Sequence, residues 1–413
     1  MRFTAGDGWR YGLLGLPLAF AALPLYVILP NHYARAYGVP LAALGSLLLA
    51  ARLLDAVTDP WIGRLCDRAY ARSTGRVLAF GAVAAAALAL GFAMLFHPPV
   101  RGTPALLAWL AAALVLTSLA YSVLSIAHQS WGAMLGGDEG RRGRVVAWRE
   151  GWGLAGVLLA SVLPLLAGVT VTALVLAATL ALGCVAWSAA PRPQPQARTA
   201  STDWRLPWRV PRFRTLLLVF VINGLASAIA ATLVLFFLQD RLAVPAAVQP
   251  LFLGAYFLSA ALALPGWLAL VPRMGLARTW RAGMLLAVAG FAAAAWLGEG
   301  DGGWFLGICI VCGAALGTDL ALPGAMLAGE IGAAGHAGRG EGAYFGWWNF
   351  AAKLTLALAA GGVLPLLAPA GYVPGAREAA SLEVLTFAYC VLPCGLKLAA
   401  AGLLHANFLR RAR

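Results

Sequence analysis

Charged side chains lie inside an apolar stretch, residues 41–63, where a hydrocarbon environment would penalise them. Arg52, Asp55 and Asp59 are spaced by three and four residues, so a helix would carry them on one face. Two carboxylates one turn apart repel each other unless a cation or a proton lies between them. Together with the Thr58 hydroxyl they offer hard oxygen ligands. We predict a cation site here, for sodium or for a proton, with a structural Arg52–Asp55 ion pair as the alternative.

A lysine lies near the middle of another apolar stretch, residues 342–367. A charge at this depth costs about 2.5–3.5 kcal/mol on insertion scales, so it should be paired, face water or perform a task. We predict that Lys353 is coupled to the Asp55/Asp59 site across the two halves of the chain. The alternative is a packing lysine that snorkels to the interface. Lys397, nearer the end of the last apolar stretch, is expected to snorkel.

A polar helix face is predicted within residues 104–134, where hydroxyl, imidazole and amide side chains follow one another. Such a face on a membrane helix lines a cavity or forms a hydrogen-bonded seam between helices. Asp319 lies in a later stretch, either as a further coupling group or as the neighbour of a kink at Pro323. The residues predicted to line a solute cavity are Tyr121, Ser125, His128, Gln129, Arg149, Asp319 and Trp347, and Ser122 lies on the same polar face.

The composition requires a membrane. The 413 residues are 62% apolar and 11% charged, whereas soluble domains average about 45–50% apolar and about 25% charged. Long runs rich in Ala and Leu, without two-residue alternation, predict helices that cross about 30 Å of hydrocarbon. The expected fold class is an all-α polytopic membrane protein with twelve transmembrane helices. The predicted spans are 11–29, 41–63, 77–97, 104–134, 144–168, 170–189, 213–238, 249–271, 279–297, 303–328, 342–367 and 384–406.

The basic residues predict the orientation. With the N-terminus inside, 23 basic residues fall in cytoplasmic segments and four in outer segments, which is the positive-inside pattern. Both termini are therefore expected in the cytoplasm, and the net charge of +14 needs no nucleic-acid partner. The polar segment 191–212 is expected to link two six-helix bundles, 1–190 and 213–413, around a central cavity.

No constellation of residues predicts an enzyme. The six cysteines lie in apolar runs without a histidine at metal-ligand spacing, and the five histidines are scattered. We expect the cysteines to pack as small apolar residues. We predict no catalytic residue and no cofactor other than the coupling ion, sodium or a proton, for which Asp55 and Asp59 are the charged ligands.

The charged turn after the second span resembles the loop between spans 2 and 3 of the major facilitator superfamily. It carries Gly63, Asp67 and Arg68, but Ala69 and Tyr70 stand where the family pattern has a further glycine. The turn is interpreted as a solvated loop or as a gate of ion pairs, and the two are compatible. The predicted gate residues are Gly63, Asp67, Arg68, Arg72 and Arg52.

A longer run, Arg52-x-x-Asp55-Ala56-x-x-Asp59-Pro60-x-x-Gly63, resembles the span 2 signature of the glycoside–pentoside–hexuronide:cation symporters, the melibiose-permease group. That group is also similar to this chain in three later segments, 326–330, 339–344 and 371–374, and in the position of Lys353 between them. The resemblance implies the major facilitator fold in a bacterial inner membrane. It also implies cation ligands at Asp55 and Asp59, with Thr58 and Ser122 as neutral oxygens, and Arg149 facing the solute beside Tyr121.

The chain departs from the permease at its sugar-binding acids. Ala19 and Ser125 stand where the permease grips galactosides with acidic residues, and Ala334 replaces an acid after span 10. Because Arg149 and Lys353 remain, a more positive cavity is expected, suited to an anionic or amphipathic solute such as a sugar acid.

The predicted function is cation-coupled symport of a small solute, a sugar or a sugar derivative, by alternating access. Alternatives are an amphipathic, lysolipid-like or other organic anion as substrate, and a passive facilitator. A membrane enzyme and a non-transporting sensor are further possibilities that the residues favour less. The expected partners are the solute and membrane lipid, and the expected state is a monomer.

Overall fold

The computed structural model describes residues 3–193, 203–367, 369–375 and 377–410, and these contain helices and turns but no strand. The chain forms two compact units. One comprises Met1–Val210 with Ala328–Phe350, and the other Pro211–Leu327 with Ala351–Arg413. The division predicted at 191–212 stays a prediction, and residues 194–202 of that linker lie outside the described residues.

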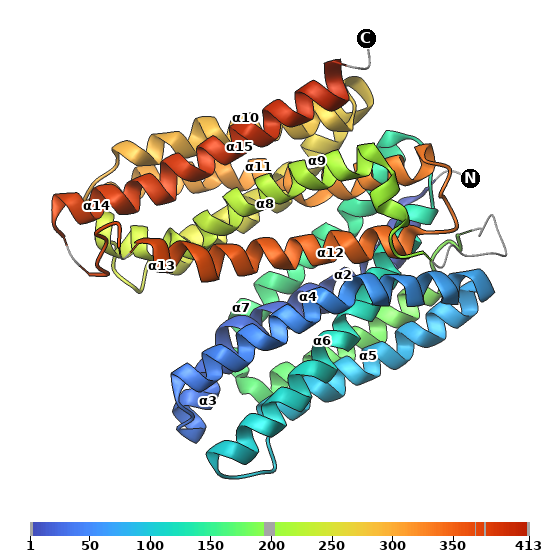
Figure 1. The fold of residues 1–413 in the computed structure, drawn as a ribbon, viewed down its shortest axis with the longest axis horizontal. Helices are drawn as coiled ribbons and strands as arrows, with labels where there is room; N and C mark the ends of the chain where they lie inside the picture. Colours follow the sequence, from blue (N-terminus) through green and yellow to red (C-terminus); the bar gives the residue numbers. More distant parts are fainter. Residues whose placement is uncertain (1–2, 194–202, 368, 376, 411–413) are drawn as a thin grey trace. The chain divides into compact units, whose positions relative to one another are not determined.

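The helices of the first unit follow one another with short turns (Figure 1). Helix α2 packs against α7, α4 against α6, and α5 against both α6 and α7. The helices are α1 (Ala5–Gly12), α2 (Gly15–Leu23), α3 (Leu29–Tyr37), α4 (Leu41–Arg72), α5 (Thr74–Phe96), α6 (Thr103–Met134) and α7 (Glu139–Ser188), with a π-helical turn, η1, at Pro24–Ile28 and a 3₁₀ turn, η2, at Leu206–Arg209.

Local signals set the helix ends in this unit. Thr4 and Asp7 form a capping box before α1. The Ser73 hydroxyl accepts the Arg76 backbone N–H at 3.1 Å and starts α5 directly after α4. Gly168, at φ 77°, breaks α7 into two spans, as the sequence predicted. Small residues allow the close packing: a Cβ on Gly156 of α7 would lie 2.2 Å from the Leu16 carbonyl of α2.

The second unit has an aromatic core. The rings of Phe237 and Tyr389 stack at 4.3 Å, and Phe305 lies 5.6 Å from Phe237. Helix α15 packs against α8 and α10. The elements from residue 211 onward are α8 (Pro211–Phe236), η3 (Phe237–Arg241), α9 (Gln249–Met274), α10 (Leu276–Ala292), η4 (Ala293–Trp296), α11 (Gly302–Ala333), α12 (Glu341–Leu358), η5 (Ala359–Val363), α13 (Leu364–Leu367), α14 (Ala379–Thr386), η6 (Phe387–Val391), α15 (Leu392–Leu404) and η7 (His405–Leu409). The end of α11 and the start of α12, within residues 328–350, belong to the first unit.

The predicted spans are helical, but four differ from simple long apolar helices. Eight helical segments of the described residues are long and apolar enough to cross a membrane. The predicted span 11–29 is divided among short helices around η1, and α10 has only 17 residues before a 3₁₀ turn. Charges lower the hydropathy of α4, and α12 gives way to a π-helical turn at Ala359. Broken and charged helices are tolerated in membranes where they face protein or a cavity.

Candidate functional site

The predicted cation site lies on α4 and α6 of the first unit. The Ser122 hydroxyl of α6 donates to Asp55 Oδ1 at 2.9 Å, and both residues are buried. Asp59, one turn further along α4, has an exposed fraction of 0%. The Thr58 hydroxyl donates to the Asp55 carbonyl at 2.9 Å, which leaves its oxygen lone pairs for another partner. Two buried carboxylates and two hydroxyls therefore gather on neighbouring helices.

The site is composed of oxygen donors. In the described part of the chain, no group of three His, Cys, Asp or Glu side chains is placed to hold a metal ion. A transition-metal site is therefore not formed by those residue types, whereas carboxylate and hydroxyl oxygens suit a hard monovalent cation. Arg52 lies half-buried on the same helix, one turn before Asp55.

Lys353 belongs to the second unit, on α12, where it is half-buried. The predicted coupling of Lys353 to Asp55 and Asp59 joins the two units and stays a prediction.

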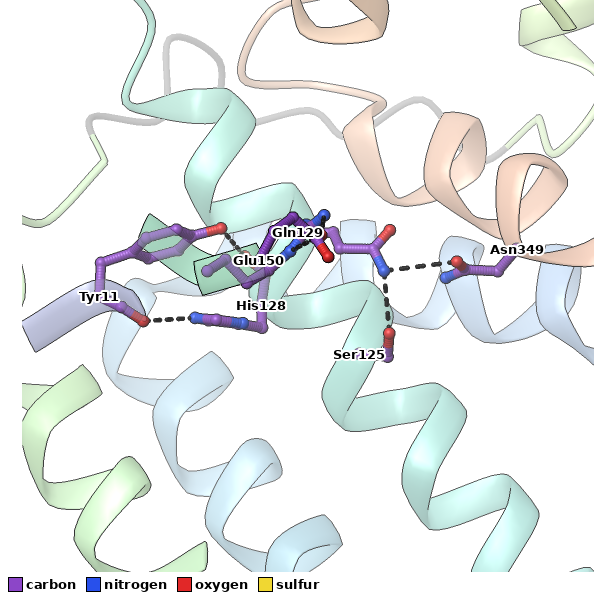
Figure 2. Close-up of polar contacts among 7 residues, drawn as sticks. Tyr11, Ser125, His128, Gln129, Glu150 and Asn349 are labelled. Carbon is purple, nitrogen blue, oxygen red and sulfur yellow. Dashed lines mark hydrogen bonds and ion pairs between the residues drawn. The ribbon is translucent and has the colours of Figure 1, made fainter. Parts of the chain in front are cut away.

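His128 lies in a closed seam between α1 and α6 (Figure 2). Its Nε2 lies 2.8 Å from the Tyr11 carbonyl, and the Tyr11 hydroxyl donates to the His128 carbonyl at 3.1 Å. Because a carbonyl only accepts, Nε2 carries the proton. His128 Nδ1 is buried without a hydrogen-bond partner, so a doubly protonated ring would leave a buried donor unpaired. The ring thus acts here as a neutral packing group.

Gln129 connects α6 to α12. Its Nε2 donates to Ser125 Oγ at 2.9 Å and to Asn349 Oδ1 at 3.3 Å (Figure 2). Gln129 and Ser125 were predicted from the sequence to line the cavity, whereas Asn349 was not. The signal was present, because a lone amide inside an apolar stretch meets the same criterion as a lone lysine.

Arg149 forms an ion pair with Glu150, its neighbour on α7, and Tyr121 is half-buried on α6. The guanidinium and the carboxylate are 15% and 23% exposed. Glu150 therefore offsets the positive charge of Arg149, which weakens the expectation of a strongly positive cavity.

The predicted gate residues Gly63 and Asp67 meet the start of α12 within the first unit. Asp67 accepts the backbone N–H groups of Gly342 and Ala343 at 2.7 and 2.9 Å. A carboxylate at a helix N-terminus satisfies donors that have no partner inside the helix. A Cβ on Gly63 would lie 2.0 Å from the Gly342 carbonyl, so the two backbones touch.

Two buried acids share this contact. Burial raises the pKa of Asp67, the negative charge of Glu341 raises it further, and the two backbone hydrogen bonds oppose the shift. Burial likewise raises the pKa of Glu341, which accepts the Gly338 N–H at 2.6 Å. Arg68 and Arg72 are exposed. The contact of Gly63 and Asp67 with α12 consists of helix capping and close backbone packing, and the solvated loop and the gate of ion pairs both stay predictions.

Trp347, predicted to line the cavity, packs into a tryptophan stack beside the gate. Its indole lies 5.5 Å from that of Trp204, which in turn stacks on Trp61 of α4 at 5.4 Å. Trp347 Nε1 donates to the Trp204 carbonyl at 2.8 Å, and Trp208 meets Trp347 edge-on at 5.0 Å. This stack was not predicted from the sequence, because Trp204 lies in a polar loop.

Asp319 and Lys397 form an ion pair inside the second unit. Lys397 Nζ lies 2.8 Å from Asp319 Oδ2 and donates to Asn223 Oδ1 at 2.9 Å. Trp280 Nε1 donates to Asp319 Oδ1 at 2.8 Å. The expectation that Lys397 snorkels is therefore wrong, because an internal carboxylate offsets its charge more directly than the interface would.

Residues 10–408 match the family of MFS/sugar transport proteins. The inner membrane symporter YicJ of Escherichia coli (strain K12) is 26% identical over 38% of this chain and 33% of its own length. YagG of the same strain, a candidate glycoside/cation symporter, is 26% identical over 39% of this chain and 35% of its own. The matched part thus spans about a third of either relative.

The fold is that of solved transporters. A bacterial homologue of the iron transporter ferroportin, in an outward-facing state, superposes with a TM-score of 0.73 at 16% identity, over 97% of this chain and 98% of the other. The likeness concerns the fold alone at this identity. The twelve-helix, all-α prediction and the prediction of a transporter family instead of an enzyme are both confirmed.

Proposed function

Because the chain belongs to the family of MFS/sugar transport proteins, we propose that it is a cation-coupled symporter of a small solute, working by alternating access. The observation that carries the proposal is the buried Asp55–Ser122 hydrogen bond, with Asp59 fully buried one turn away. Acids at this depth are retained where they bind something whose charge matters to the cycle. The names of YicJ and YagG agree with symport.

The coupling ion is bound by the carboxylates of Asp55 and Asp59, with the Ser122 and Thr58 oxygens as neutral ligands. Two negative charges one turn apart oppose closure of a low-dielectric site, and a bound cation reduces their repulsion. The loaded carrier therefore reorients more readily than the carrier with an empty ion site. Coupling is this difference between the ion-loaded and the ion-free carrier in the relative stability of their conformations.

Opening toward the cytoplasm requires that the gate contact break. Asp67 must release the Gly342 and Ala343 N–H groups, and α4 must part from α12 at Gly63. The gate is thus a reversible helix cap, whose loss is offset by water once the backbone is exposed.

We propose a sugar or a sugar derivative as the solute, which agrees with the name of YagG. The Arg149–Glu150 ion pair favours a neutral or weakly anionic solute over a strongly anionic one. The amide and hydroxyl groups of Gln129, Asn349 and Ser125 form the kind of network that binds sugar hydroxyls. An amphipathic anion and passive facilitation are the competing outcomes of the test.

The test is uptake by proteoliposomes under a sodium or a proton gradient, with glycosides, hexuronates and lysophospholipids as labelled solutes. Concentrative uptake of a glycoside that disappears in Asp55→Asn and persists in Glu299→Gln supports the proposal. Glu299 is a suitable control because its carboxylate is 72% exposed in a surface ion pair. Uptake that only equilibrates the solute, with or without a gradient, indicates a facilitator and contradicts symport.

We also propose a monomer in the inner membrane with both termini in the cytoplasm. The positive-inside distribution of arginine supports the orientation. Alkaline phosphatase and fluorescent protein fused to the C-terminus report the side directly. Phosphatase activity from the C-terminal fusion contradicts the proposed orientation.

A further inference from the structure

An apolar cavity of about 250 Å³ lies among α8, α9, α10, α11, η6 and α15. Aromatic rings and thiols form most of its lining, including Phe291, Phe305, Cys309 and Cys312. An engineered cavity of about 150 Å³ in another protein stays dry and binds benzene. The space here is therefore large enough for a substituted aromatic ring.

One end of this cavity is polar. Asp319 and Lys397, the ion pair described above, are among its lining residues. An ammonium has three N–H donors, and among the described residues Lys397 uses two of them, on Asn223 and Asp319. Asp319 accepts on both oxygens, from Trp280 and Lys397. The polar end thus has one donor left and a carboxylate whose two oxygens are already engaged.

The charge at this end is balanced. The positive charge of Lys397 is offset by Asp319 at 2.8 Å, so a charged guest would bury a charge without a counter-ion, which is unfavourable. A neutral oxygen acceptor, in contrast, would satisfy the remaining ammonium N–H without adding charge. A guest without any acceptor would fill the apolar space but leave that donor unpaired.

We propose that this cavity is a binding site for a small, neutral, mainly apolar molecule with one hydrogen-bond acceptor, such as an aromatic ketone. Its carbonyl accepts from Lys397 Nζ, and its ring lies against the aromatic and thiol lining. The site lies wholly within the second unit and shares no residue with the proposed cation site on α4 and α6. The cavity is therefore separate from the proposed cation site, although Asp319, predicted to line the solute cavity, is one of its lining residues.

The experiment uses the purified full-length protein in detergent with three probes of similar size: acetophenone, ethylbenzene and benzoate. Binding is measured by saturation-transfer NMR and by protection of Cys309 and Cys312 from N-ethylmaleimide, resolved by peptide mass spectrometry. Cys184, in the first unit, is the internal reference. We expect acetophenone to bind about three- to tenfold more tightly than ethylbenzene, the equivalent of one net hydrogen bond. Benzoate should give no protection.

A cavity-filling variant tests the location. Ala230→Phe, from α8, should abolish protection by acetophenone, whereas Ala269→Phe on the exposed side of α9 should leave it unchanged. Should Ala230→Phe fail to fold, Ala287→Leu fills the same cavity from α10. Binding that survives in the filled variants, or that is lost equally in Ala269→Phe, overturns the proposal.

A paired variant tests the polar end. Lys397→Met combined with Asp319→Leu removes donor and acceptor together. We expect it to bind acetophenone and ethylbenzene equally. Retained preference for the ketone, or equal binding of both probes by the unaltered protein, contradicts the assignment of Lys397 as the donor. Either result leaves the uptake assay for the proposed symport unaffected.

Discussion

A buried aspartate has different neighbours in the two units. In the second unit Asp319 forms an ion pair with Lys397 and accepts a hydrogen bond from the Trp280 indole, so its charge is balanced within the chain. In the first unit Asp55 meets a neutral hydroxyl, and a second acid, Asp59, is buried one turn away. Arg52 lies half-buried on the same helix, one turn before Asp55. A balanced pair suits a fixed structural role, whereas two neighbouring acids suit a site whose charge changes during a cycle.

The substitution that tests this difference between the units most strongly is at Asp59. We expect Asp59→Asn to abolish concentrative uptake, because one of the two charges that bind the proposed cation is gone. The measurement is solute accumulation against a gradient in proteoliposomes. Exposed Glu299→Gln should accumulate solute normally. Undiminished accumulation by Asp59→Asn would contradict the assignment of a cation site to the first unit, and with it the difference from the balanced ion pair of the second unit.

In the second unit the large effect is on stability. Lys397→Met alone leaves Asp319 buried without its cation and should destabilise the protein by about 3–5 kcal/mol. Lys397→Met with Asp319→Leu should restore most of that loss, because an ion pair replaced by apolar groups is often neutral. Thermal unfolding in detergent checks both variants. A double variant as unstable as the single one would show that the pair does more than balance its own charge.

Ser122→Ala should have a smaller effect. It removes one hydrogen bond to Asp55, worth about 1 kcal/mol, so the apparent affinity for the coupling cation should fall by about fivefold. The maximal uptake rate should stay near its original value because both carboxylates remain. Cation titration of uptake measures the change. Ser130→Ala, the same substitution on the same helix away from Asp55, is the matched control.

The smallest expected effect is on the pH dependence of the gate. Burial raises the pKa values of Asp67 and Glu341 above their ordinary values of 3.8 and 4.5. The closed contact therefore favours the protonated acids: it is most stable below the ordinary values and loses stability as pH rises through the raised ones. Tryptophan fluorescence of the stack at Trp204 between pH 4 and pH 8 reports this change. Glu341→Gln should reduce the slope, and an unaltered slope would count against the two acids as its source.

Much of the helical fold follows from the sequence because the length of an apolar run that crosses a bilayer depends on the thickness of the bilayer. The breaks were less predictable: the π-helical turn at Pro24–Ile28 follows from tertiary packing, which a hydropathy window does not contain. The break in α7 was predictable, since Gly168 adopts a left-handed φ that favours glycine.

The candidate site was predictable where one helix carries it. The spacing of Asp55 and Asp59 placed both on α4, whereas the Ser122 contact needed the resemblance to a family. Partners from distant segments were not predictable: nothing in the sequence pairs Lys397 with Asp319 or Asp67 with the backbone of Gly342. Periodicity describes one helix at a time, and these contacts depend on how helices pack.

The tryptophan stack has a mechanical consequence. Trp204 is held between Trp61 and Trp347, so the end of the connecting loop belongs to the first unit up to Val210. Pro211 begins α8 and the second unit at the very next residue. The chain crosses between the units again at residues 327–328 and 350–351, so the segment that ends in the stack is one of three covalent connections between them.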